Sequence, residues 1–336
     1  MLAMAVDPLA HALRPVRREV PRPSDGELLL RVRACGVCRT DLHIIDAELP
    51  VHRPQVIPGH EIIGEVVGRG VGANRFRVGS RVGVPWLGHT CGNCVWCFSG
   101  LENLCDAPAF TGYDRDGGYA EYVVADERYC LDLPPSYDDA HAAPLLCAGL
   151  IGYRTWRLAG GAAHRRIGLW GFGAAAHIVC QLASAHGQEV HAFTRPGDHE
   201  GQAFARELGA TWAGGSDEAP PQLLDANLIF APVGALVPAA LATVRKAGRV
   251  VCGGIHMSDI PRFPYELLWG ERELRSVANL TREDGSAFFD LLSRVPLRTQ
   301  VVVFPLEQAP AAVEALRTGS VTGAAVLVPG SAGQAS

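Results

Sequence analysis

The sequence has no excess of positive charge and no long apolar segment, and both absences limit what the protein can be. Its 336 residues include 30 Lys and Arg against 35 Asp and Glu, so the formal net charge is −5. Lysine itself occurs once, at Lys246. Nucleic-acid-binding domains are usually strongly basic, so we expect no nucleic-acid partner. No apolar run approaches the ~20 residues that cross a bilayer, so we expect no membrane partner either.

The first residues also lack the features of a secretory signal. Met1 to Val6 are apolar, but no basic segment precedes them and the apolar stretch is short. We therefore expect a cytoplasmic protein, in which thiols stay reduced. Because disulfides are not expected there, the ten cysteines must be metal ligands or core residues.

The length and the hydrophobic pattern predict two domains of different kinds. Between Gly26 and Arg81, short β-strand patterns alternate with glycine-rich turns, and Tyr119 to Ala125 continues the β pattern. After Ala140 helices alternate with strands, beginning with a helix predicted at Leu145–Ala159. Strands that alternate with helices indicate a parallel sheet covered by helices. The expected fold class is therefore α/β, with a doubly wound parallel sheet beside a mostly-β domain.

Four cysteines lie close together with the spacing C-x2-C-x2-C-x7-C. They are Cys91, Cys94, Cys97 and Cys105. Four thiolates from one loop can surround Zn²⁺ tetrahedrally, and a site closed by four protein ligands is structural. An iron–sulfur cluster is the competing interpretation, but bacterial ferredoxins use a last gap of three residues followed by proline. The spacing therefore predicts structural zinc.

Three further residues are candidates for a second metal site. They are Cys38, His60 at the head of a predicted strand, and Cys147 at the start of the helical half. Two cysteines with one histidine form a known ligand set for catalytic zinc, which leaves one position open. Cys35 competes with Cys38 for this role, and we assign it to packing. The remaining cysteines lie in strand or helix patterns and are expected in the core: Cys130, Cys180 and Cys252.

A glycine-rich loop follows the predicted strand that ends at Trp170 and opens the next helix. Its residues are Gly171, Phe172, Gly173, Ala174, Ala175 and Ala176, which read G-x-G-x-x-A. The first glycine permits a tight turn, the second lets backbone approach a pyrophosphate, and the small third residue lets helix and strand pack closely. The next strand ends at Thr194 and Arg195, without the acidic residue that binds a ribose 2′-hydroxyl.

Taken together, these residues resemble the zinc-containing medium-chain alcohol dehydrogenases, and within them the bacterial and cinnamyl-alcohol-dehydrogenase-like enzymes. The matching motifs occur in the family's order and cover nearly the whole chain: residues 36–43, 59–61, the four-cysteine loop, 117–122, 146–149 and 171–176. The resemblance implies a GroES-like catalytic domain at 1–148 with its zinc lobe at 91–105. It also implies a Rossmann domain at 149–278 and a return to the catalytic domain at 279–336.

The resemblance also implies roles for residues around the second metal site. Cys38, His60 and Cys147 would hold catalytic zinc, and Glu61 would approach it. Thr40 matches the hydroxyl that hydrogen-bonds the substrate oxygen. His43 matches the last member of a proton relay, and Arg39 is placed to reach the coenzyme pyrophosphate. Trp86 and Leu87 are expected to line an apolar pocket, with Trp269 as a weaker candidate.

The predicted activity is reversible hydride transfer between a primary or secondary alcohol and NAD(P), with two zinc ions per chain. Arg195 favours NADP(H) over NAD(H), because a 2′-phosphate would meet a cation there and no acid. The expected partner is a small alcohol or aldehyde, and the family suggests a homodimer or homotetramer. A polyol or formaldehyde dehydrogenase is an alternative within enzymes. A non-catalytic zinc- and nucleotide-binding relative is another, although it would be expected to lack one of the second-site ligands.

Overall fold

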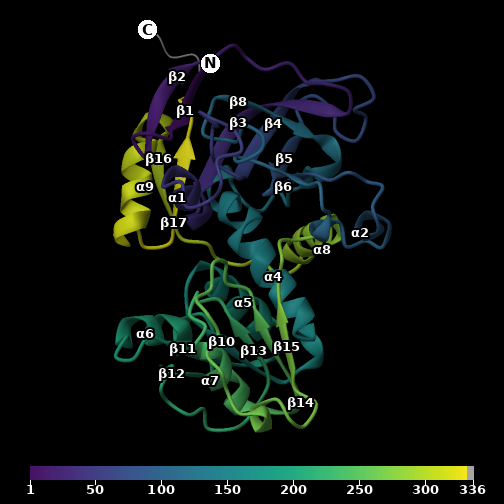
Figure 1. Ribbon diagram of the computed structural model, residues 1–336. Coiled ribbons are helices and arrows are strands. Elements are labelled where there is room, and N and C mark those ends of the chain that lie inside the picture. Colours follow the sequence, from purple (N-terminus) through teal and green to yellow (C-terminus); the bar gives the residue numbers. More distant parts are fainter. Residues whose placement is uncertain (331–336) are drawn as a thin grey trace. The chain divides into compact units, whose positions relative to one another are not determined.

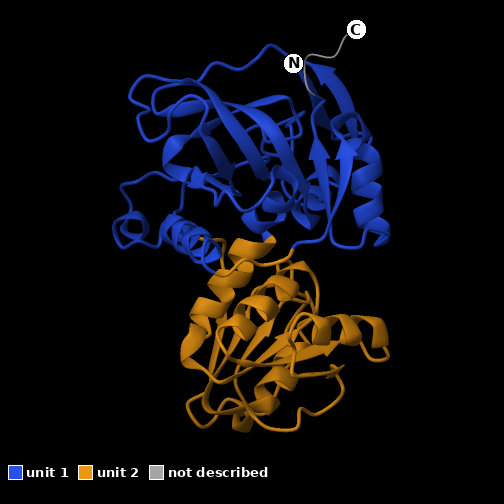
Figure 2. Cartoon of the chain, turned by 180° about the vertical axis from the view of Figure 1, so that it is seen from behind, with its two compact units in different colours: residues 1–147, 281–294, 299–336 blue, residues 148–280, 295–298 orange. Residues whose placement is uncertain are grey.

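A computed structural model describes residues 1–330, which form two compact units (Figure 2). Unit 1 comprises Met1–Cys147, Thr281–Arg294 and the chain from Thr299 onward, and unit 2 comprises Ala148–Leu280 and Val295–Arg298. The last six residues of the predicted return segment lie outside the described residues. Among residues 1–330, no helix is long and apolar enough to cross a membrane.

Unit 2 is built on a parallel sheet with the strand order β12-β11-β10-β13-β14-β15 (Figure 1). This is the 3-2-1-4-5-6 order of dinucleotide-binding sheets. The central strands are almost wholly buried, because helices cover both faces of a doubly wound sheet. The strands are β10 (Arg166–Trp170), β11 (Glu189–Thr194), β12 (Trp212–Gly215), β13 (Leu224–Ile229), β14 (Val244–Cys252) and β15 (Glu273–Ser276). The helices are α4 (Ala148–Leu158), α5 (Ala174–Ala185), α6 (His199–Glu207) and α7 (Leu236–Thr243), with 3₁₀ turns at Gly161–Ala163 and Tyr265–Leu267.

Unit 1 is mostly β-sheet. Its largest sheet has the order β16-β17-β3-β4-β5-β9, and β8 also pairs with β3. The long strand β3 alternates buried and exposed residues, as expected for a sheet with one face on a core. β17 runs antiparallel to β3 with Val326 opposite Gly36, so the C-terminal segment lies in the same sheet as the residues that precede Cys38.

The strands of unit 1 are β1 (Leu2–Asp7), β2 (Ala12–Arg17), β3 (Glu27–Val37), β4 (Glu61–Arg69), β5 (Arg81–Val84), β6 (Leu87–His89), β7 (Ala109–Phe110), β8 (Tyr122–Asp126), β9 (Leu131–Asp132), β16 (Val301–Pro305) and β17 (Ala324–Val328). The α-helices are α1 (Arg39–Ile45), α2 (Val95–Phe98), α3 (Asp139–Ala142), α8 (Arg282–Leu292) and α9 (Ala309–Thr318). The 3₁₀ turns are Glu102–Leu104, Glu127–Tyr129, Ala143–Leu146 and Leu306–Gln308.

The predicted fold class is confirmed, but one local prediction needs correction and one strand was not predicted. The helix expected from Leu145 begins only at Ala148, because a 3₁₀ turn containing Pro144 precedes it and Cys147 has non-helical dihedrals of φ −123° and ψ −74°. The apolar N-terminal residues also form a strand that the sequence pattern did not indicate. β1 pairs with β2, and Ala3 to Val6 are buried in the core of unit 1.

Candidate active site

The candidate metal site lies where β3 ends and α1 begins. Cys38 is the N-cap residue of α1, and its backbone N–H donates to the Asp41 carboxylate at 2.8 Å. His60 lies directly before β4, which pairs with β3. Cys147 lies in the break between the 3₁₀ turn and α4. Three separate segments of unit 1 therefore supply the three predicted ligands.

The structure brings these three side chains together. One ligand atom from each of Cys38, His60, Glu61 and Cys147 lies within 4.8 Å of all the others. The sulfurs of Cys38 and Cys147 are 3.5 Å apart. Zinc–sulfur bonds of about 2.3 Å in tetrahedral geometry place two sulfurs about 3.8 Å apart. The cluster therefore has the donor chemistry and the spacing of a zinc site.

Glu61 reaches the cluster because the opposite strand has no side chain in its way. Gly36 of β3 is paired with Glu61 of β4, and a Cβ at Gly36 would lie 1.8 Å from Glu61 Oε2. Glu61 is only 4 % exposed. Any residue larger than glycine at position 36 would push this carboxylate away from the cluster. The sequence placed Glu61 next to the ligand His60, and the structure places its carboxylate at the cluster.

Charges inside the cluster act strongly on one another. Burial lowers the pKa of His60, but the Asp41 carboxylate and the Cys38 sulfur together raise it well above the usual value. Hydrogen bonding with Cys147 lowers the pKa of Cys38 well below its usual value, whereas the same contact and burial raise that of Cys147. Burial, together with the Cys38 charge, raises the pKa of Glu61. A divalent cation would offset the cost of burying these anionic donors.

The predicted relay residues lie on one helix. Thr40 and His43 are three positions apart on α1, so they lie on the same face. The Thr40 hydroxyl is buried and lies 3.8 Å from the Cys38 sulfur. His43 is half-buried, and its Nδ1 contacts the carboxylate of Glu48. Arg39 is exposed at the first position of the helix.

The two predicted pocket residues have different surroundings. The Trp86 ring meets the His60 ring edge-on at 4.9 Å and stacks on Phe110 at 5.0 Å, and Trp86 is half-buried. Leu87 lies in β6 and is 1 % exposed. The weaker candidate, Trp269, lies in unit 2 and is 65 % exposed. Trp86 therefore packs against a residue of the candidate metal cluster, as a pocket residue would.

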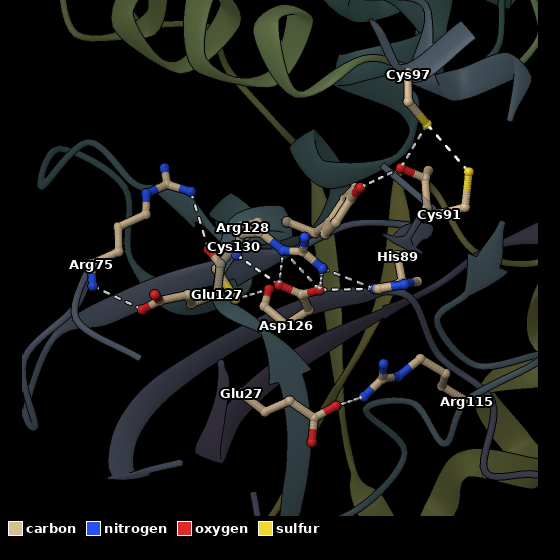
Figure 3. Close-up of polar contacts among 12 residues, drawn as sticks. Glu27, Arg75, His89, Cys91, Cys97, Arg115, Asp126, Glu127, Arg128 and Cys130 are labelled. Atoms are coloured by element: carbon tan, nitrogen blue, oxygen red, sulfur yellow. Dashed lines mark hydrogen bonds and ion pairs between the residues drawn. The ribbon is translucent and has the colours of Figure 1, made fainter. Parts of the chain in front are cut away.

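The four cysteines of the lobe also converge. The sulfur of Cys97 lies 3.5 Å from that of Cys94 and 4.0 Å from that of Cys91, and Cys91 lies 3.5 Å from Cys105. Figure 3 shows Cys91 and Cys97 facing each other. These distances bracket the ~3.8 Å expected around tetrahedral zinc. The Thr90 hydroxyl, 3.4 Å from Cys97, lowers the pKa of that thiol to about 7.

Polar contacts connect the lobe to the rest of unit 1. The Thr90 hydroxyl is hydrogen-bonded to the Tyr129 hydroxyl at 2.6 Å. The Arg282 guanidinium of α8 lies 5.3 Å from the centre of the Tyr129 ring. Glu102, in the lobe and 4 % exposed, accepts hydrogen bonds from the backbone N–H and the Nε of Arg282. The lobe is thus held against both the 3₁₀ turn Glu127–Tyr129 and α8.

Four cysteines lie outside both clusters within residues 1–330. They are buried, as predicted for core residues: Cys35, Cys130, Cys180 and Cys252. Burial raises the pKa of Cys180 to about 12 and that of Cys252 to about 11. These thiols are therefore protonated at neutral pH and behave as apolar core groups.

The glycine-rich loop has the geometry expected for dinucleotide binding. Gly171 has φ +85°, and a Cβ there would lie 2.5 Å from the Ala231 Cβ. Gly173 is the N-cap of α5, and apart from its two chain neighbours no described residue has an atom within 4 Å of a Cβ built there. Ala176 is fully buried between helix and sheet. Phe172, Ala174 and Ala175 complete the exposed or half-buried loop. A helix N-terminus with open backbone is suited to an anion.

The residues after β11 divide into buried and exposed ones. Thr194 is 3 % exposed, and its hydroxyl accepts a hydrogen bond from Gln202 Nε2 at 3.2 Å. Arg195 is exposed. Asp198 is the N-cap of α6 and accepts the Gly201 N–H at 2.9 Å. This carboxylate is therefore engaged in capping, and Arg195 is the charged side chain exposed at the strand end.

Comparison with known proteins identifies the family. The chain is 47 % identical over 322 residues to "Probable alcohol dehydrogenase AdhA" of Mycobacterium tuberculosis, covering 94 % of this chain and 92 % of the relative. The chain belongs to the medium-chain alcohol dehydrogenase family. An alcohol dehydrogenase of Geobacillus stearothermophilus is 32 % identical, with 97 % of this chain and 98 % of the relative covered. Residues 24–135 match the model of the alcohol dehydrogenase GroES-like domain.

Solved structures agree with this membership. A thermostable alcohol dehydrogenase from Pyrobaculum aerophilum, solved with cobalt and zinc bound, has a TM-score of 0.87 and 25 % identity, covering 98 % of this chain and 99 % of the other. A cinnamyl alcohol dehydrogenase from Sorghum bicolor has a TM-score of 0.87 and 25 % identity, with 97 % of each chain covered. The predicted family is confirmed, and with it the class of NAD(P)-dependent alcohol oxidoreductases.

For this alcohol dehydrogenase family member, sequence analysis missed Asp41. Its carboxylate is fully buried, accepts the Tyr119 hydroxyl at 3.0 Å and the Gly59 N–H at 3.2 Å, and lies 3.4 Å from His60 Nδ1. A carboxylate behind a histidine ligand orients the ring and fixes which nitrogen faces the metal. The sequence did contain a pattern that could have indicated it, because an acidic residue three positions after a helix N-cap can accept a hydrogen bond from the N-cap backbone. Its contact with His60 depends on strand pairing.

Proposed function

We propose that this chain is a zinc-dependent alcohol dehydrogenase and aldehyde reductase that transfers hydride reversibly between an alcohol and NAD(P). The reaction converts an alcohol and NAD(P)⁺ into an aldehyde or ketone, NAD(P)H and a proton. The observation that supports it most directly is the buried cluster of Cys38, His60 and Cys147, whose spacing suits zinc. A zinc assay combined with an NAD(P)H-coupled panel of alcohols and aldehydes tests it.

The residues present fit two metal ions. Cys38, His60 and Cys147 would hold catalytic zinc with Glu61 within reach, and the four lobe cysteines would hold structural zinc. Zinc held there would supply a Lewis acid that lowers the pKa of the substrate hydroxyl. The acetophenone reductase of Geotrichum candidum, 26 % identical, was solved with NAD, which supports a nicotinamide coenzyme.

The chain's own residues supply binding and proton transfer. Asp41 orients His60 through its Nδ1 edge and leaves Nε2 for the metal. The Thr40 hydroxyl hydrogen-bonds the substrate oxygen and passes its proton on, and His43 releases that proton to solvent. A neutral imidazole can accept a proton near neutral pH.

The Trp86 ring next to His60 is the proposed apolar wall for the substrate. Arg39 and the loop at Gly171–Ala176 are proposed to bind the coenzyme pyrophosphate.

Replacing His43 by glutamine is expected to slow alcohol oxidation mainly below neutral pH, where solvent is a poor proton acceptor. The loss should be about tenfold to a hundredfold, at or below the low end of general acid–base effects, because solvent partly replaces a terminal relay group. Steady-state kinetics over a range of pH would measure it, with His141→Gln as a control for an exposed histidine. Loss of zinc in His43→Gln would contradict the relay role and indicate a ligand.

The coenzyme preference depends on Arg195. We propose NADP(H) over NAD(H), because Arg195 is exposed where a 2′-phosphate would lie and Asp198 is engaged in capping. A hydrogen bond to a charged group contributes ~1.5–3 kcal/mol, so Arg195→Leu should lower kcat/KM for NADPH by about tenfold or more. The value for NADH should change little.

The matched control is Arg165→Leu, because Arg165 is exposed just before β10 and pairs with Glu189. It should leave both coenzyme efficiencies unchanged. A higher wild-type kcat/KM with NADH than with NADPH would refute this preference. An unchanged kcat/KM for NADPH in Arg195→Leu would refute it as well.

Other functions make different predictions for the same panel. A polyol or formaldehyde dehydrogenase would prefer those substrates over simple alcohols. A non-catalytic relative would bind zinc and nucleotide without turnover, but the candidate catalytic ligands are all present in this chain. We further propose a cytoplasmic homodimer or homotetramer, as the family resemblance suggests, and light scattering would determine the oligomeric state.

A further inference from the structure

The end of helix α1 folds the chain back onto His43. Asp46 is the C-cap, and the next residue, Ala47, has φ +55°. The Ala47 N–H donates to the Ile44 carbonyl at 3.3 Å, and the Glu48 N–H donates to the His43 carbonyl at 3.0 Å. This is the hydrogen-bond pattern of a Schellman motif, with alanine at the position where glycine is usual. A non-glycine residue in this conformation costs about 1 kcal/mol or more.

The fold-back puts the Glu48 side chain against the His43 ring. The Glu48 carboxylate contacts His43 Nδ1. An ionised carboxylate can only accept a hydrogen bond, so Nδ1 must carry the hydrogen of this contact. In a neutral imidazole the other nitrogen is then an acceptor. Glu48 thus favours the ring form in which Nε2 can take up a proton.

A second contact holds this helix end in place. Arg317 of α9 donates to both oxygens of Asp46, at 2.6 and 2.8 Å. Hydrogen bonds from Arg317 lower the pKa of Asp46, and the nearby His11 and His43 act in the same direction. The C-terminal segment of unit 1 therefore fixes the backbone from which Glu48 reaches His43.

We propose that Glu48 is a positioning residue that fixes the Nδ1–H tautomer of His43, so that Nε2 is the nitrogen that accepts the proton released by alcohol oxidation. The consequence for catalysis rests on the proposed function, in which His43 ends the proton relay. The effect on the tautomer does not, because it follows from the contact alone. The proton is not transferred to Glu48, because His43 takes it up at Nε2 and then releases it to solvent.

The direct test is a ¹⁵N NMR measurement of the histidine rings at mildly alkaline pH. The chain has 12 histidines, and the His43 signals are assigned by their disappearance in His43→Gln. In the wild type, Nδ1 of His43 should carry the hydrogen. In Glu48→Ala most of the population should shift to Nε2–H. Glu48→Gln should lie between them, because an amide oxygen also accepts from Nδ1–H but more weakly than a carboxylate.

The kinetic test measures proton release in a single turnover with a pH indicator. Glu48→Ala should slow proton release about two- to fivefold, because that is the change in rate that corresponds to the free energy of an exposed ion pair. KM for the alcohol should stay unchanged. The same substitution should have no effect in a His43→Gln background. Glu65→Gln is the charge control, because Glu65 is a surface carboxylate of unit 1 paired with Arg31.

The outcomes separate this inference from the proposed function. Unchanged His43 ring signals in Glu48→Ala would overturn the inference, and so would a changed tautomer with unchanged proton release. If the protein has no dehydrogenase activity, the proposed function fails, while the NMR result still decides whether Glu48 sets the tautomer.

Discussion

Replacing Cys147 by alanine is expected to abolish alcohol dehydrogenase turnover while the chain stays folded. Cys147 contributes one of the two sulfurs of the candidate catalytic cluster, 3.5 Å from that of Cys38. Without it, Glu61 is the one further donor that residues 1–330 bring to Cys38 and His60. We expect turnover to fall at least about a thousandfold, which corresponds to the several kcal/mol that a Lewis-acidic metal contributes.

Zinc content distinguishes a catalytic role from a structural one. The wild type should bind two zinc ions per chain, and Cys147→Ala should bind close to one with a nearly unchanged Tm. Cys180→Ala is the matched control, because Cys180 is a buried cysteine of α5 outside both clusters. It should keep both zinc ions and turnover. Wild-type activity in Cys147→Ala would refute the catalytic assignment.

Replacing Cys97 by serine should instead weaken the fold. Cys97 lies within 4.0 Å of two other cysteine sulfurs, and Thr90 connects it to Tyr129. Structural zinc binding is coupled to folding, so losing one of four ligands should destabilise the lobe and its contacts with α8. We expect a loss of about 3 kcal/mol or more, which lowers the Tm of a unit of this size by about 6–12 °C.

The lobe offers a control next to the mutated residue. Phe98 follows Cys97 in α2 and is 79 % exposed, so Phe98→Ala should leave both zinc content and Tm unchanged. Differential scanning calorimetry with and without a chelator measures the effect. If chelation lowers the Tm of Cys97→Ser as much as that of the wild type, the lobe does not depend on Cys97 for its metal.

Much of this molecule could be predicted from local sequence. The G-x-G-x-x-A loop between a strand and a helix is a local motif, because all of its small residues lie within six positions. In the structure a Cβ at Gly171 would clash with Ala231, and Ala176 is fully buried. The four lobe cysteines are also local, since 15 residues contain all of them. The strand and helix periodicities predicted the α/β class because each of them is also a pattern of neighbouring residues.

Other features depended on residues far apart in the chain. The contact of Asp41 with His60, the space that Gly36 leaves for Glu61, and the aromatic neighbours of Trp86 all require strands to pair in a particular register. The start of the helix was predicted three residues before Ala148, because hydrophobic periodicity does not distinguish the 3₁₀ turn before Cys147 from an α-helix. That turn determines where the Cys147 sulfur lies.

The sequence by itself determined the fold class, the family, and the residue types of the candidate metal donors and the candidate coenzyme loop, because these depend on residue chemistry and short spacing. Only the tertiary structure decided which donors meet, which carboxylate supports His60, and that Glu48 contacts His43. The physical reason is that these contacts form between side chains brought together by sheet pairing and by a left-handed turn at Ala47. Neither is encoded in the pattern of polar and apolar residues alone.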